Sequence, residues 1–127
     1  MTFYALSSGP GISGIAVIRI SGKETSKIIE KLTGKQVPKP RIATLRKINK
    51  INTSELIDEG LILWFPGPES YTGEDMAEIH VHGSKAVIDA FHFTLSNIEN
   101  CRLAEPGEFT KLAFQNGKIN LLKAESI

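Results

Sequence analysis

One stretch, residues 66–83, constrains the fold more than any other: a turn-rich loop runs directly into an alternating strand, PGPESYTGEDMAEIHVHG. Between residues 76 and 82, every second residue is Ala, Ile or Val. Successive side chains of a strand point to opposite faces, so this apolar set is predicted to face a core. The alternate positions are predicted to share the second face; they are Met76, Glu78, His80 and His82. This pattern is typical both of a ligand-binding edge and of an ordinary sheet with one exposed face.

The composition indicates one soluble globular domain. Of the 127 residues, 41% are hydrophobic and 23% are charged, which is enough apolar material for a core. A formal net charge of +1 gives no general electrostatic reason for direct RNA or membrane binding, so any RNA contact is expected elsewhere. The single cysteine, Cys101, fits a reducing compartment and is expected to be a buried or boundary thiol. Without a leader peptide or an apolar run of membrane-spanning length, a cytoplasmic location is expected.

Two short strands are predicted to pair at the start of the chain, over residues 2–6 and 15–21. The turn between them, GPGISG at residues 9–14, matches the GxGxxG pattern of dinucleotide-binding loops. That motif requires a helix directly after the glycines, so that the helix N-terminus faces a pyrophosphate. The sequence that follows, IAVIRIS, is strand-like, so a glycine-rich turn is predicted here and a nucleotide site is not.

The remaining pattern mixes helices with strands. Apolar residues at helical spacing predict helices in residues 22–34, in residues 84–97 and from residue 106 onward. Further strands are predicted in residues 41–51, 56–65 and 101–104. The basic residues of the segment 41–51 are expected to form a solvated strand face, because no aromatic residues are interleaved for base stacking. The fold class is therefore predicted to be α+β, a mixed or antiparallel sheet covered by helices.

Two arrangements of polar residues suggest chemistry. Arg19 stands within the apolar strand 15–21, where a charge is costly unless it is paired or reaches a ligand. An ion pair with a carboxylate is the simpler structural explanation. Glu78, His80 and His82 share a face and suggest an alternative, a zinc site in a metal-dependent hydrolase. No cysteine accompanies them, and the remaining histidine lies in a predicted helix without a linking motif.

Three blocks of the chain resemble one family: residues 9–22, 63–83 and 104–127. Their sequences are GPGISGIAVIRISG, LWFPGPESYTGEDMAEIHVHG and AEPGEFTKLAFQNGKINLLKAESI. They resemble the N-terminal domain of MnmE, also called TrmE, the tRNA-modifying GTPases. The resemblance implies a fold similar to the folate domains of glycine-cleavage aminomethyltransferases. It also implies a tetrahydrofolate-binding, homodimer-forming domain over residues 1–118 and the start of a helical domain over residues 119–127.

The reaction implied by this resemblance belongs to the whole enzyme. With a flavoprotein partner, MnmG, the family uses a tetrahydrofolate one-carbon unit to modify carbon 5 of the wobble uridine of tRNA. The 5-formyl or 5,10-methylene form is expected as the folate ligand, and tRNA is expected to be contacted through the full assembly. GTP, Mg and K belong to a GTPase domain whose phosphate-loop motif, GxxxxGK[ST], does not occur in this chain. The chain alone is therefore expected to catalyse neither GTP hydrolysis nor tRNA modification.

The family's folate-contacting positions fall on Arg19, Glu78 and Lys118, and all three residue types are retained. Arg19 stands in the family's I-R-[IL]-S-G block, Glu78 is the second acid of GEDxxE, and Lys118 is the lysine of N-x-K. Tyr71 and Trp64 are candidates to stack on the ligand's ring faces. No metal ligand and no catalytic residue are expected in this chain.

The chain departs from the family pattern at two loops. The usual Thr-Pro-Pro-Gly is Ser-Gly-Pro-Gly at residues 8–11, and the usual Gly-His-Gly-Gly is Val-His-Gly-Ser at residues 81–84. The catalytic cysteine of the family lies outside this chain, so Cys101 inherits no role. Besides the metal hydrolase, a dimerisation module that binds no ligand is the second alternative to a folate domain.

Overall fold

The computed structural model describes residues 1–8 and 14–118. The strands of this part are β1 (Thr2–Ser8), β2 (Ile15–Ser21), β3 (Thr44–Asn49), β4 (Leu56–Phe65), β5 (Met76–His82) and β6 (Cys101–Leu103). Its helices are α1 (Thr25–Thr33), α2 (Lys85–Ser96) and α3 (Glu108–Gln115). Each strand and helix predicted within the described residues is present. The strand predicted over residues 41–51 is shorter at both ends: Arg41 has a φ of 63°, outside the extended region, and a turn begins after Asn49.

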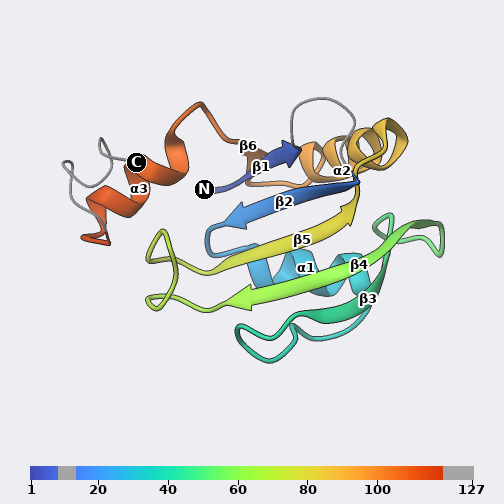
Figure 1. Cartoon of the computed structure of the whole chain (residues 1–127), viewed down its shortest axis with the longest axis horizontal. Helices are drawn as coiled ribbons and strands as arrows, with labels where there is room; N and C mark the ends of the chain where they lie inside the picture. Colours follow the sequence, from blue (N-terminus) through green and yellow to red (C-terminus); the bar gives the residue numbers. More distant parts are fainter. Residues whose placement is uncertain (9–13, 119–127) are drawn as a thin grey trace.

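The strands form a single sheet in the order β3-β4-β5-β2-β1-β6 (Figure 1). β1 and β6 pair in parallel, and the other neighbours pair antiparallel. The predicted α+β class with a mixed sheet is confirmed. A strand follows Gly14 directly, as predicted, so the helix that a dinucleotide loop needs is absent at this point. The turn residues 9–13 themselves lie outside the described residues.

Helices α1 and α2 cover one face of the sheet (Figure 1). The alternation in β5 has the predicted outcome, because Ala77, Ile79 and Val81 are buried in the core under these helices. The second face carries the alternate β5 side chains, and neither α1 nor α2 packs on it. The alternation in β5 therefore predicts which face of the sheet is buried under the helices and which face can bind a ligand.

The ends of the first two helices follow their sequence signals. Gly34 caps α1 with a φ of 70°, and its N–H donates to the carbonyl of Glu30. Ser84 caps α2, with its hydroxyl accepting from the N–H of Val87 at 3.2 Å. No helix of the described residues is long and apolar enough to cross a membrane.

Helix α3 lies at one end of the sheet, beside the loop formed by residues 66–75 (Figure 1). The side-chain amide of Asn116 donates to the carbonyl of Thr72 at 2.7 Å, which ties the end of α3 to that loop. The hydroxyls of Thr72 and Ser21 lie 2.9 Å apart and tie the loop to β2. Only Ala113 of the predicted apolar side of α3 is buried, and Phe114 is exposed, so α3 is a peripheral element.

Candidate functional site

The centre of the site is an ion pair between two neighbouring strands. Arg19 of β2 stands directly opposite Glu78 of β5 in the antiparallel register. Its Nε lies 3.0 Å from Oε2 of Glu78. Alternation places both side chains on the face without α1 and α2, where the Arg19 side chain keeps 47% of its exposure and that of Glu78 keeps 23%. The apolar neighbours of Arg19 in the sequence suggested a charge buried in the core, but its side chain is half exposed. The expected carboxylate partner is present.

His80 is the second partner of the Glu78 carboxylate. Its Nε2 lies 3.0 Å from Oε1, so each oxygen of Glu78 has one polar neighbour. Burial acts to raise the pKa of Glu78, but hydrogen bonds from His80 and Arg19, together with the Arg19 charge, hold this pKa below its ordinary value. The carboxylate is thus ionised and fixed in orientation at neutral pH.

A pocket of about 310 Å³ opens beside this ion pair. The residues that line it are Arg19, Tyr71, Met76, Glu78, Phe109 and Thr110. They come from β2, the loop 66–75, β5 and the first turn of α3. The pocket thus combines one carboxylate and one guanidinium with aromatic and thioether walls, a lining suited to a flat, partly apolar ligand with a polar edge.

Tyr71 and Thr110 join two sides of the pocket. The Tyr71 hydroxyl lies 3.3 Å from the Thr110 hydroxyl, which connects the loop to α3. Tyr71 remains 48% exposed, so much of its ring surface is open to a neighbour. The predicted position of Tyr71 near the site is consistent with this geometry.

Lys118 lies apart from the lining of this pocket. Its N–H donates to the carbonyl of Ala113 at 2.8 Å, so its backbone closes the turn after α3. Its Cε would lie 3.4 Å from a β-carbon built on Gly73, which places the side chain against the loop that also supplies Tyr71. The structure brings Arg19 and Glu78 together, and it places the Lys118 side chain after α3 against the loop 66–75, beside Gly73.

The prediction that Trp64 stacks on a ligand at this site was wrong. Trp64 stands opposite Ala77 in the β4–β5 register and is buried in the core under the helices. Met76 and Phe109, by contrast, were not predicted as pocket walls. The alternation of β5 places Met76 beside Glu78 and was a usable signal, whereas nothing in the sequence showed where α3 would carry Phe109.

The side chains proposed for a metal hydrolase do not converge. His82 turns to Asp58 of β4, with Nδ1 2.9 Å from Oδ2, while His80 bonds to Glu78. Burial acts to raise the pKa of Asp58, but hydrogen bonds from the His82 backbone and ring hold this pKa below its ordinary value. Among residues 1–8 and 14–118, no group of three or more His, Cys, Asp or Glu side chains is arranged to hold a metal ion.

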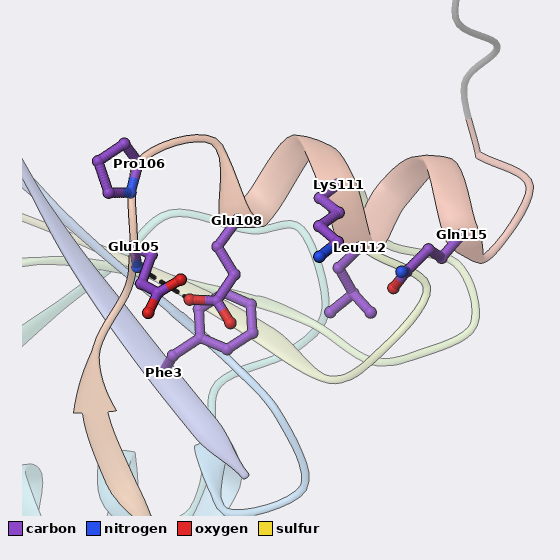
Figure 2. Close-up of a pocket in the computed structure, with 7 residues that line it drawn as sticks. All are labelled: Phe3, Glu105, Pro106, Glu108, Lys111, Leu112 and Gln115. Carbon is purple, nitrogen blue, oxygen red and sulfur yellow. Dashed lines mark hydrogen bonds between the residues drawn. The ribbon is translucent and has the colours of Figure 1, made fainter.

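A second pocket, of about 290 Å³, lies between Phe3 and α3 (Figure 2). It is lined by Phe3, Glu105, Pro106, Glu108, Lys111, Leu112 and Gln115. The rings of Phe3 and Phe109 meet edge to face, with centroids 4.8 Å apart, and separate the two pockets. In the second pocket Glu108 is engaged by Arg102 and by the N–H of Glu105, and none of the predicted ligand-binding residues lines it.

Comparison with known proteins identifies the family. The model of the family described as the GTP-binding protein TrmE N-terminus matches residues 2–118. The chain belongs to this family. The match covers every strand and helix described above, including the pocket beside Glu78. It ends at Lys118, immediately after α3 and its closing turn.

Curated relatives agree with this assignment. The tRNA modification GTPase MnmE of Pelagibacter ubique (strain HTCC1062) is 79% identical over 127 residues, which is 100% of this chain and 29% of that protein. The mitochondrial 5-taurinomethyluridine-[tRNA] synthase subunit GTPB3 of Danio rerio is 48% identical over 126 residues, covering 99% of this chain and 25% of that protein. The MnmE of Zymomonas mobilis is also 48% identical, with 29% of its length covered. The chain thus spans less than a third of the relatives it matches.

Proposed function

We propose that the pocket beside Glu78 binds the pterin ring of a reduced folate, with the Glu78 carboxylate as its anchor. The observation that carries this proposal is an ionised carboxylate held by Arg19 and His80 at the edge of a pocket with aromatic and thioether walls. A pterin ring has adjacent N–H donors on one edge, which a carboxylate accepts as a pair. Its flat faces suit the walls that Tyr71, Met76 and Phe109 provide.

The existing hydrogen bonds of Glu78 leave room for such a ligand. A carboxylate has about four lone-pair sites, of which Arg19 and His80 use two. The ligand therefore need not displace either partner. Because the carboxylate is already ionised and oriented, binding costs little rearrangement of this group.

Arg19 and Lys118 supply positive charge for the rest of the ligand. Folates carry carboxylates on their tail and oxygen or nitrogen acceptors near the one-carbon unit, and both kinds of group accept from a guanidinium or an ammonium. Arg19 lines the pocket, and Lys118 lies beside the loop that forms one wall. When bound, the folate supplies a one-carbon unit; the residues of this chain bind and orient it.

At the level of the whole protein, we propose a tRNA-modifying GTPase of the MnmE type. The family match and the names of the relatives support a tRNA-modifying GTPase. We further propose that the whole protein works with the flavoprotein MnmG on carbon 5 of the tRNA wobble uridine. Within it, the present chain is the folate-binding and homodimer-forming domain. GTP hydrolysis belongs to parts of the relatives outside the stretch matched here.

Isothermal titration calorimetry with 5-formyltetrahydrofolate tests the ligand assignment. Glu78→Gln and Arg19→Ala should each weaken binding roughly ten- to hundredfold, because each removes a charge-assisted contact worth about 1.5–3 kcal/mol. Lys118→Ala should also weaken binding. Two matched controls are Glu59→Gln, an exposed carboxylate on β4, and Lys111→Ala, which faces the second pocket.

The controls should bind as the wild-type protein does. Equal affinity in Glu78→Gln and wild type would remove Glu78 from the site. Absence of binding to a well-folded wild-type protein would leave a dimerisation module without a ligand as the better description.

Light scattering tests the homodimer. The account predicts twice the chain mass at high protein concentration, and monomer mass throughout would contradict it. The isolated chain should show no GTP turnover above that of a sample purified from cells without its gene.

A further inference from the structure

The basic residues of the chain are concentrated in one segment. Residues 35–50, KQVPKPRIATLRKINK, contain six of the fifteen Lys and Arg residues and no acid. Because the formal net charge of the whole chain is only +1, the rest of the chain is net acidic. The small net charge therefore results from a basic segment and an acidic remainder that nearly cancel.

The fold places this segment along one edge of the sheet. β3 is an edge strand, and within the described part of the chain it pairs with β4 alone (Figure 1). Before β3, the N–H of Arg41 donates to the carbonyl of Trp64 at the end of β4, and after β3, Lys50 pairs with Glu55 at 3.1 Å. The set of Lys35, Lys39, Arg41, Arg46, Lys47 and Lys50 is called the basic edge below.

Half of the basic-edge side chains have no ion-pair or hydrogen-bond partner among residues 1–8 and 14–118. In the part of the chain that the structure describes, the ammonium groups of Lys35, Lys39 and Lys47 make no ion pair or hydrogen bond, and all three residues are exposed. Arg41 donates to the backbone carbonyl of Glu69, which leaves its charge uncompensated. Lys50 is the one member with a carboxylate partner there, Glu55.

A hollow of about 470 Å³ lies in the middle of the basic edge. Its lining includes Lys35, Arg46, Lys47 and the neutral polar residues Thr33 and Asn49. Nε of Arg46 is shielded from solvent and has no hydrogen-bond partner, which is unusual for a buried donor. One carboxylate, Glu59, also lines the hollow, opposite Lys47 in the β3–β4 register, so three cations face one anion.

We propose that the basic edge binds the phosphate backbone of RNA at a base-paired region. The exposed ammonium groups of Lys35, Lys39 and Lys47 match the charge and the acceptor oxygens of phosphates. Base-paired RNA is contacted through its backbone, which requires no aromatic side chains, so their absence from residues 35–50 is no obstacle. RNA is favoured over an acidic protein because the relatives are named for action on tRNA.

The proposal revises the expectation that RNA is contacted elsewhere, which rested on the net charge. Net charge averages over the whole surface, whereas a phosphate backbone responds to the charge within about 10 Å at moderate salt. The proposal is independent of folate binding, because the basic edge shares no residue with the pocket beside Glu78.

The salt dependence of tRNA binding tests this proposal in the whole protein. Unmodified tRNA is titrated at a series of salt concentrations, and the slope of log K against log salt is compared between variants. Removing a phosphate-contacting lysine reduces this slope by about 1, so the double variant Lys35→Gln, Lys47→Gln should reduce it by about 2. The matched control, Lys85→Gln with Lys111→Gln, removes the same charge from α2 and α3 and should leave the slope unchanged.

Each other outcome overturns the proposal. An unchanged slope in the Lys35, Lys47 variant means that the edge does not contact RNA. If that variant also self-associates, the lysines serve to block strand pairing at an exposed edge. If instead it loses binding to an acidic polypeptide such as poly-glutamate and keeps its tRNA slope, the partner is an acidic protein. An equal loss of slope in the control variant shows diffuse attraction without a site.

Discussion

At the scale of single residues, Glu78 is the group on which the site depends. Its two oxygens face Arg19 across the strands and His80 along the same strand. Because its pKa is lower in the folded chain, ionised Glu78 stabilises the fold at pH above the ordinary glutamate value of about 4.3. This contribution to the free energy of unfolding is lost as the pH falls from the ordinary glutamate pKa through the lowered pKa of Glu78.

The His80→Leu variant should raise the pKa of Glu78. The substitution removes the hydrogen bond that is the largest of the effects opposing burial. His80→Gln keeps a hydrogen-bond donor, so the pKa of Glu78 in this variant should lie close to its wild-type value. A purely structural role for His80 does not predict this rescue. The carboxyl carbon shift of Glu78, followed by NMR as a function of pH, gives the pKa directly.

His82→Leu is the matched control for that experiment. His82 lies on the same face of β5 but bonds to Asp58. The His82→Leu variant should raise the pKa of Asp58, because it removes the side-chain hydrogen bond, and should leave the pKa of Glu78 as it is in the wild-type protein. If both histidine variants shift the pKa of Glu78 equally, the cause is a general change in β5. The specific contact between His80 and Glu78 is then not responsible.

Cys101 should react slowly with thiol reagents in the folded protein. Burial raises the pKa of its thiol to about 11, and the residue is only 8% exposed. At pH 8 the rate of labelling by a chromogenic disulfide should rise strongly when the protein is unfolded in denaturant. Fast labelling of the folded protein would contradict the position of Cys101 in the core.

At the scale of elements, β5 was the most predictable part of the fold. Its period of two fixed both faces, because burying one set of side chains forces the other set outward. β3 was predicted too long, because the positive φ of Arg41 keeps this residue out of the strand and a turn follows Asn49. The face of Trp64 was not predicted, because LILWF is apolar throughout and contains no alternation that distinguishes its two sides.

The Gly60→Ala substitution in β4 should destabilise the protein by about 1–3 kcal/mol. A β-carbon there would lie 2.3 Å from the carbonyl oxygen of His80 and 2.9 Å from Cγ1 of Val81. β4 and β5 would have to separate locally to accept it. Gly14→Ala is the control, because a β-carbon at Gly14 has nothing within 4 Å. Urea denaturation measures both, and equal stability of the two variants would contradict the close approach.

At the scale of the whole molecule, the candidate site is made from four separate segments. β2 and β5 supply the ion pair, the loop 66–75 supplies Tyr71, and α3 supplies Phe109 and Thr110. The carboxylate and guanidinium were predictable from strand alternation and the family motifs. The walls were not, because α3 reaches the sheet through the contact of Asn116 with Thr72 and the packing of Phe109 on Phe3, which join residues far apart in the sequence.

The central claim is that folate binds in the pocket beside Glu78, and methyl NMR during titration with 5-formyltetrahydrofolate tests it most directly. Met76 lines that pocket, and Leu112 lines the second pocket across the Phe3–Phe109 contact. The account predicts a saturable shift of the Met76 methyl signal, with the Leu112 signals little changed, and loss of this response in Glu78→Gln. Shifts confined to Leu112, or a Met76 response that survives unchanged in Glu78→Gln, would contradict it.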